Sequence, residues 1–139
     1  IKFREIFRPF APIVLAERAK DFFEINNIDN HYQPENYMLS VSKVFSDKSN
    51  LFPSAISIDN SARVQILWKD NEKQSLLRGI IEKFDKDIGI PMLINTSFNR
   101  RGEPIVENPN QAFKIFKTSK VDGIFIGDFY CIKNDLSKV

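Results

Sequence analysis

Residues 91–104 read PMLINTSFNRRGEP, a short apolar run that leads directly into a polar and basic loop. The run from Pro91 to Asn95 does not alternate between apolar and polar residues, which predicts a strand buried on both faces of a sheet. The loop from Thr96 to Pro104 gathers hydroxyls, amides and two arginines. In open α/β sheets, ligands bind just past the carboxyl ends of strands. The stretch therefore predicts a mixed α/β fold and the place of a binding site.

Helices are predicted on both sides of this stretch. Residues 72–88 carry an apolar stripe at helical spacing and are followed by Gly89, a typical C-terminal stop. The run 108–111, NPNQ, has the pattern of a capped helix start. A further helix is predicted over residues 13–26, where apolar side chains recur at helical spacing.

Strands account for most of the remaining apolar segments. Alternation, or short apolar runs bounded by turn residues, predicts strands over 37–45, 54–58, 62–68, 121–126 and 129–133. Asp59-Asn60 is expected to form a tight turn, because asparagine tolerates positive φ. This order of elements predicts an α/β fold, with α+β as the alternative. We expect one domain over residues 1–139, built on a twisted mixed β-sheet flanked by helices.

The composition limits the classes of function. The chain has 139 residues, 42% of them apolar, and a net charge of +2, so it fits one ordinary domain without a strong basic excess. One cysteine, Cys131, and one histidine, His31, exclude an internal disulfide and a Cys/His zinc site within the chain. No apolar run is long enough to span a bilayer, and no signal peptide opens the chain. A cytoplasmic protein is expected, and the first residue, Ile1, suggests a fragment of a longer chain.

Common catalytic and nucleotide-binding motifs cannot be written with these residues. The five glycines do not form a P-loop or a Rossmann fingerprint. A Ser-His-Asp triad would need His31, which lies in a polar segment and is expected to be an exposed loop residue. Any nucleotide site in this chain must therefore use another arrangement.

Two groups of cations remain as candidates. Lys2, Arg4 and Arg8 would share one face of an extended segment and could grip phosphate or carboxylate, although a solvated terminal strand is the simpler interpretation. Arg63 shares a face with Gln65 on a predicted inner strand, where burial demands a partner anion. A ligand and a structural salt bridge explain Arg63 equally well.

The third candidate group is the loop 95–104. It is denser in polar side chains than a turn requires, and it is expected to sit on a rigid scaffold, as many binding loops do. A functional loop is therefore favoured here over a capped surface loop.

Taken in order, these groups resemble a known family. The segments that carry the resemblance are 2–5 (KFRE), 7–12 (FRPFAP), 37–39 (YML), 59–65 (DNSARVQ), 95–99 (NTSFN), 101–106 (RGEPIV), 122–123 (DG) and 126–129 (IGDF). They look like the carboxyl-terminal domain of NodU/CmcH-type O-carbamoyltransferases, a domain similar to YrdC. Both carry a K-x-R and an S-x-N signature, which fall here on Lys2, Arg4, Ser97 and Asn99. The match runs in order over nearly the whole chain.

The resemblance implies an adenylate-forming domain. In the family, ATP and carbamoyl phosphate are converted into carbamoyl-adenylate, with Mg²⁺ accompanying the nucleotide. A preceding actin-like ATPase-type domain, which also carries the family's metal site, then passes the carbamoyl group to a hydroxyl acceptor. The catalytic cations that it implies are Lys2, Arg4 and Arg63. The residues that it implies for binding ATP and substrate are Lys2, Arg4, Arg8, Arg63, Ser97 and Asn99, where cations and donors would stabilise charge on phosphate oxygens.

Three positions depart from the family pattern. Asn60 and Arg100 stand where the family often has a glycine and an apolar residue. The family also often has a histidine near the position of Ser57, which this chain lacks. None of them touches the two signatures. The alternative hypothesis is a non-catalytic YrdC-like module that binds RNA or a protein partner through the same basic face. The net charge of +2 makes nucleic acid the weaker of these partners, and no membrane association is expected.

Overall fold

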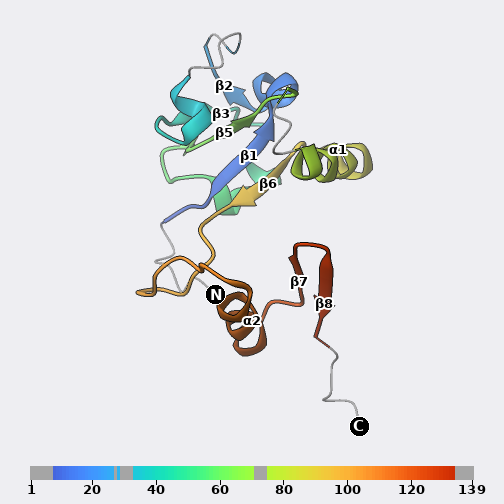
Figure 1. Ribbon diagram of the computed structural model, residues 1–139. Helices are drawn as coiled ribbons and strands as arrows, with labels where there is room; N and C mark the ends of the chain where they lie inside the picture. The colour runs from blue at the N-terminus through green and yellow to red at the C-terminus, as the bar shows by residue number, and fades with distance from the viewer. Residues whose placement is uncertain (1–7, 27, 29–32, 71–74, 134–139) are drawn as a thin grey trace. The chain divides into compact units, whose positions relative to one another are not determined.

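The computed structural model describes residues 8–26, 28, 33–70 and 75–133. The chain separates into two compact units, Ile6–Thr96 and Ser97–Val139 together with Ile1–Glu5. We call the first the sheet unit and the second the hairpin unit, after their β-structures (Figure 1). Within the described ranges, no helix is both long enough and apolar enough to cross a membrane.

The sheet unit is organised around β1 (Ala11–Leu15), the central strand of a three-stranded sheet. β5 (Gln65–Leu67) pairs with β1 in parallel, and β6 (Met92–Asn95) pairs with it in the antiparallel sense (Figure 1). All five residues of β1 are buried. Ile13 and Val14 suit this position, because β-branched side chains pack well on a pleated surface.

The two faces of this sheet bury different clusters. On one face α1 (Ser75–Ile88) supplies Ile81, and the cluster consists of Ile13, Leu15, Leu67 and Ile81. On the other face the sheet residues Val14, Ile66 and Met92 join a larger cluster that includes Phe22, Phe23, Val44, Ala62 and Val64. The central strand is therefore covered on both sides by apolar side chains, which is where most of the stabilisation by burial arises.

A second three-stranded sheet contributes to the larger cluster. It is antiparallel, with β3 (Ser42–Val44) between β2 (Phe23–Glu24) and β4 (Ser61–Ala62). The turn into β4 places Asn60 at φ 60°, as the sequence predicts, and its side-chain nitrogen donates to the Val44 carbonyl at 2.8 Å. The described part of this unit also contains four short 3₁₀ helices: η1 (Ala16–Asp21), η2 (Pro34–Tyr37), η3 (Ser49–Leu51) and η4 (Pro53–Ala55).

A buried arginine ties α1 to the rest of the sheet unit. Arg78 is only 7% exposed, and its guanidinium contacts the carboxylates of Glu17 in η1 and Glu82 in α1, the latter at 2.8 Å. It also donates to the Leu67 carbonyl at 3.4 Å. Because a buried charge is costly unless it is paired, these contacts fix the helix against both η1 and β5.

The described residues of the hairpin unit, 97–133, form a loop, one helix and one β-hairpin. α2 (Pro109–Thr118) begins at Asn108, whose side-chain oxygen accepts from the Gln111 amide at 3.0 Å. The Gln111 side chain in turn accepts from the Glu107 amide at 2.9 Å. The helix thus has an asparagine N-cap followed by proline, as the sequence predicts, and the glutamine side chain satisfies the amide of the residue before the cap. β7 (Gly123–Ile126) and β8 (Phe129–Ile132) pair in the antiparallel sense across a turn with Gly127 at φ 57° (Figure 1).

The predicted helix over residues 13–26 is wrong. The segment instead contains most of β1, the 3₁₀ helix η1 and the short strand β2. Residues 13–15 are buried on both faces of a sheet, so they show no period-two alternation to mark them as a strand. Phe22, which follows η1, and Phe23, the first residue of β2, both pack in the larger cluster.

Two strand predictions also differ from the structure. The expected strand over 54–58 is wrong, because Pro53–Ala55 forms η4. The expected strand over 37–45 shrinks to Ser42–Val44, and the apolar residues Leu39 and Val41 just before it are 77% and 66% exposed. Pro34 starts a 3₁₀ turn just before this segment, and the chain joins the sheet only after it.

The remaining elements follow the sequence. α1 ends at Ile88 and is followed by Gly89 at φ 74°, whereas residues 72–74 of the predicted helix lie outside the described residues. β6 is present, but Ile94 is 51% exposed, so the prediction of a strand buried on both faces is wrong at that position. The mixed α/β class is confirmed, with the strands divided among three small sheets.

Candidate functional site

The loop after β6 is a closed turn held by its own hydrogen bonds. The Ser97 hydroxyl donates to the Asn99 side-chain oxygen at 2.8 Å, and the Asn99 side-chain nitrogen donates to the Glu103 carbonyl at 2.8 Å. The Val106 amide closes the base of the loop by donating to the Phe98 carbonyl at 2.9 Å. Ser97 and Asn99 are therefore held in fixed positions before any ligand binds, which lowers the entropy cost of binding.

Arg100 fastens this loop to α2. Its guanidinium donates to the hydroxyl of Thr118 in the last turn of the helix. The Thr118 hydroxyl donates onward to the Lys114 carbonyl at 2.6 Å. The residue that departs from the family pattern thus has a local role in the hairpin unit.

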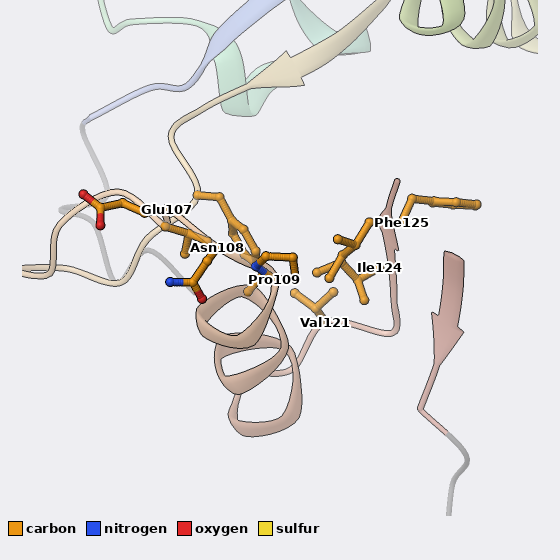
Figure 2. Close-up of a pocket in the computed structure, with 10 residues that line it drawn as sticks. Glu107, Asn108, Pro109, Val121, Ile124 and Phe125 are labelled. Atoms are coloured by element: carbon orange, nitrogen blue, oxygen red, sulfur yellow. The ribbon is translucent and has the colours of Figure 1, made fainter. Parts of the chain in front are cut away.

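An apolar pocket in the hairpin unit includes Phe98, the middle residue of this turn. Its volume is about 490 Å³, and its lining is Phe98, Val106, Glu107, Asn108, Pro109, Ala112, Val121, Ile124, Phe125 and Ile126. Figure 2 shows Val121 and Ile124 beside Pro109 at the start of α2, while the Glu107 carboxylate points away from them. Phe98 stands between Ser97 and Asn99, neither of which lines the pocket. The Ser-Phe-Asn turn therefore contributes its phenylalanine, and neither of its polar side chains, to the pocket lining.

The pocket has the character of a small-molecule site. Most of its lining side chains are aliphatic or aromatic, and the polar residues in the lining are Glu107 and Asn108. A volume of this size suits a flat organic group that needs burial on its faces and hydrogen bonds at its edges.

A second set of polar side chains lies in the sheet unit. Asn95 at the end of β6 donates its side-chain amide to the Gln65 side-chain oxygen in β5. Gln65 donates to the Asn36 backbone carbonyl at 3.4 Å, and the Trp68 indole donates to the Asn36 side-chain oxygen at 2.8 Å. The sequence places Gln65 and Asn95 near candidate site residues but does not reveal that the two side chains meet. No sequence signal could have found this contact, because it depends on how β5 and β6 each pair with β1.

Arg63 does not occupy the predicted inner strand. It lies between β4 and β5, where the chain passes from one sheet to the other, and its side chain is exposed. The argument that burial forces it to meet an anion is therefore wrong. Arg63 and Gln65 do lie in the same unit, two residues apart.

The remaining predicted site residues fall in different parts of the chain. Arg8 is exposed just before β1 in the sheet unit, and Ser97 and Asn99 belong to the hairpin unit. Lys2 and Arg4 lie outside the described residues, so their meeting with Ser97 and Asn99 stays a prediction.

The turn that precedes Arg63 carries a perturbed carboxyl group. The Ser61 hydroxyl and amide donate to one oxygen of Asp59 at 2.6 and 3.1 Å. These bonds favour the ionised form and hold the pKa of the Asp59 carboxyl below its usual value. The two bonds from Ser61 stabilise the turn just before Arg63.

Comparison with known proteins places the chain in a family. A family model described as the carbamoyltransferase C-terminus matches residues 1–133. Nodulation protein NolNO of Sinorhizobium fredii is 36% identical over 137 residues, which are 99% of this chain and 19% of that protein. Nodulation protein NolO of Bradyrhizobium diazoefficiens is 33% identical over 137 residues, which are 99% of this chain and 24% of that protein.

A further relative, nodulation protein U of Sinorhizobium fredii, is 35% identical over 102 residues, 73% of this chain and 17% of that protein. The chain thus spans about a fifth of the length of the curated relatives that it matches. Because the family model covers nearly every residue, this chain belongs to the carbamoyltransferase C-terminus family.

Proposed function

We propose that this chain is the YrdC-like, adenylate-forming part of a larger O-carbamoyltransferase. In this proposal it binds ATP and carbamoyl phosphate and produces carbamoyl-adenylate. Membership of the family supports a role in carbamoyl transfer. The observation that carries the proposal is the Ser-Phe-Asn turn, where two fixed hydrogen-bonding side chains flank a phenylalanine that lines an apolar pocket.

The proposed reaction has two parts. Water takes the phosphoryl group of carbamoyl phosphate, which releases inorganic phosphate and leaves a carbamate anion. A carbamate oxygen then attacks the α-phosphorus of ATP, the bond from that phosphorus to the bridging oxygen breaks, and pyrophosphate leaves. The second part needs no general base, because the carbamate is already ionised.

Charge builds on phosphate oxygens during both parts, so the proposed residues are cations and hydrogen-bond donors. Ser97 and Asn99 would donate to the phosphates or orient the ribose. The cations assigned to the phosphates are Lys2, Arg4, Arg63 and, as a weaker candidate, Arg8. The roles of Lys2 and Arg4 rest on the sequence signature alone, whereas the exposure of Arg63 and Arg8 leaves both side chains accessible to an anion.

The apolar pocket suits the adenine base. A purine offers two flat faces for contact with side chains such as Phe98 and Ile124, and it has polar edges that Asn108 in the pocket lining could meet. Mg²⁺ is proposed to accompany the nucleotide, because this ion binds phosphate oxygens and water more readily than an all-protein cage. When bound, it would neutralise charge on the phosphates.

The acceptor half of the reaction is assigned to another part of a longer protein. The relatives extend well beyond the matched region, which makes up 17–24% of their length. A preceding actin-like ATPase-type domain would take carbamoyl-adenylate and pass the carbamoyl group to a hydroxyl acceptor. The choice of acceptor then belongs to that domain.

Calorimetric titration with ATP and Mg²⁺, with and without carbamoyl phosphate, tests the proposal. We expect the chain to bind ATP and Ser97→Ala to bind it about tenfold more weakly, the loss typical of one hydrogen bond to a charged group. Ser49→Ala removes a serine hydroxyl from η3 that donates only locally, at 3.0 Å to the Ser46 carbonyl, and should leave the affinity unchanged. Pyrophosphate release that requires carbamoyl phosphate would support adenylate formation. Salt-sensitive RNA binding without any heat from ATP would instead favour the non-catalytic module.

A further inference from the structure

Gln65 and Asn95 come from strands on opposite sides of β1. Gln65 pairs with Ile13 in the parallel ladder, and Asn95 pairs with Ala11 in the antiparallel ladder. Because alternate residues of a strand share a face, the side chains of Gln65 and Asn95 emerge on one face of the sheet. The methyl group of Ala11 is small, and the two amides meet through a hydrogen bond from the Asn95 nitrogen to the Gln65 oxygen.

Further contacts hold this amide pair in place. The Gln65 nitrogen donates to the Asn36 carbonyl at 3.4 Å, and the Asn95 nitrogen lies 3.9 Å from the Met38 sulfur. Met38 has φ 56° and ψ 33°, a left-handed conformation that is uncommon for so large a side chain. Such conformations persist where the surroundings hold them, and they collect at binding sites. The Leu39 amide donates to the Pro34 carbonyl at 3.0 Å and maintains this bend.

The pair keeps hydrogen-bonding capacity for a ligand. A primary amide offers two N–H donors and an oxygen with two acceptor positions. Among the described residues, none donates to the Asn95 side-chain oxygen, and Gln65 uses one donor and one acceptor position. Both side chains are half-buried. The two amides are therefore fixed in orientation and still reachable from solvent.

We propose that Gln65 and Asn95 recognise the carbamoyl group of the substrate, an inference that rests on the proposed function. A carbamoyl group is planar and presents one N–H₂ donor and one carbonyl acceptor on the same edge. A side-chain amide presents the complementary pair of groups, so the two can form paired hydrogen bonds. Asn95 precedes Ser97 by two residues, and peptide geometry limits the separation of their Cα atoms to about 7 Å. Ser97 is thus close to Asn95 along the chain.

This arrangement predicts selection against acetyl phosphate. Acetyl phosphate has the shape of carbamoyl phosphate but carries a methyl group in place of the amino group. The methyl group cannot donate, so it would leave an acceptor of the amide pair without a partner. A site built to hydrogen-bond a substrate rejects the analogue that lacks the donor, although half-burial reduces the effect. We expect at least tenfold tighter binding of carbamoyl phosphate.

The test compares the two phosphates by calorimetry in the presence of α,β-methylene ATP, which cannot release pyrophosphate. Gln65→Met and Asn95→Leu keep the approximate size of each side chain and remove the amide. Both should reduce the selectivity for carbamoyl phosphate to about twofold or less while the affinity for the ATP analogue stays unchanged. Asn50→Leu removes an exposed amide in η3 and serves as the control. A purely structural network would lower the melting temperature without changing the selectivity.

A measurement on the unmodified chain covers the case in which a variant fails to fold. The side-chain NH₂ signals of Gln65 and Asn95 in ¹⁵N-resolved NMR should shift on addition of carbamoyl phosphate, and less with acetyl phosphate. Unchanged signals, or equal affinity for both phosphates, would overturn the inference while ATP binding could still stand. If neither carbamoyl phosphate nor the ATP analogue binds, the proposed function fails as well.

Discussion

The sheet unit and the hairpin unit are stabilised in different ways. In the sheet unit, β1 is enclosed between α1 and the second sheet, and Val14, Phe23 and Ile81 are at most 1% exposed. In the hairpin unit, Phe125 and Phe129 of the hairpin are each 76% exposed. An isolated two-stranded hairpin is marginally stable in water, so the hairpin unit depends on local devices such as the α2 cap and the stacked pair of Phe125 and Tyr130.

The candidate site reflects the same difference. The amides of Gln65 and Asn95 are positioned by strand register across β1, which is fixed by a buried core. Ser97 and Asn99 are positioned by hydrogen bonds within one loop. The amides of Gln65 and Asn95 should keep their geometry as long as the sheet unit is folded. Ser97 and Asn99 should lose their fixed positions when single hydrogen bonds of the loop are removed.

The largest expected effect separates two phenylalanines, one from each unit. Phe23→Ala should destabilise the sheet unit by about 3–5 kcal/mol, because it removes a buried ring. The centroid of this ring lies 6.5 Å from that of Phe22 and 5.6 Å from that of Phe52. Phe125→Ala should cost about 1 kcal/mol or less, since it removes one partner of an exposed stack. Urea unfolding monitored by the single tryptophan, Trp68, reports on the sheet unit.

The comparison fails if both substitutions shift the Trp68 transition equally. Equal shifts would mean that the exposed hairpin is as important to the core as Phe23. Hydrogen exchange of the β7 and β8 amides provides the complementary measurement, because Phe125→Ala should accelerate exchange there and leave β1 protected.

The parts of the fold that could be predicted are those with local signals. The stripe and glycine stop of α1, and the Asn-Pro-Asn-Gln start of α2, are contained in a few consecutive residues. The strand β1 could not be predicted from the sequence, because a strand buried on both faces has no alternation and its apolar spacing also fits a helix. The sequence also does not indicate that the predicted strand 62–68 is interrupted at Arg63. The chain passes there from the second sheet to the first, and only the pairing of β4 and β5 with different strands shows this.

The same distinction between local and long-range features applies to the candidate site. The loop with Ser97 and Asn99 could be predicted, because its polar residues are contiguous and follow an apolar strand. The contact between Gln65 and Asn95 could not, since these residues are 30 positions apart and meet only through the register of two different strand pairs. Long-range pairing of this kind leaves no mark in a single sequence.

A smaller effect is expected at the start of α2. Asn108→Ala removes the side-chain oxygen that accepts from the Gln111 amide, and loss of such a cap typically costs about 1 kcal/mol. Amides of α2 should then exchange about fivefold faster in native-state hydrogen exchange, a factor that corresponds to that energy. Asn110→Ala, at an exposed position two residues later, is the matched control and should change little. Faster exchange in β1 as well would show that the stability of the sheet unit depends on this cap.

The smallest expected effect is a dependence of the sheet unit on pH through Glu17. Partial burial acts to raise the pKa of the Glu17 carboxyl, but the hydrogen bond and charge of Arg78 outweigh it and hold that pKa below its usual value. Because the folded-state pKa lies below the unfolded-state value, this stabilisation is complete above the unfolded pKa and is lost as the pH falls through the folded pKa. The loss should be about 0.5 kcal/mol, because the Glu17 side chain is half exposed.

Urea unfolding at pH 6 and pH 3 should show Glu17→Gln destabilised only at the higher pH, whereas Glu24→Gln, an exposed change in β2, should match the parent at both. If the stabilities of the parent and of Glu17→Gln change equally between the two pH values, then the charge of Glu17 does not stabilise the contact between η1 and α1, and the other contacts of Arg78 suffice to hold it.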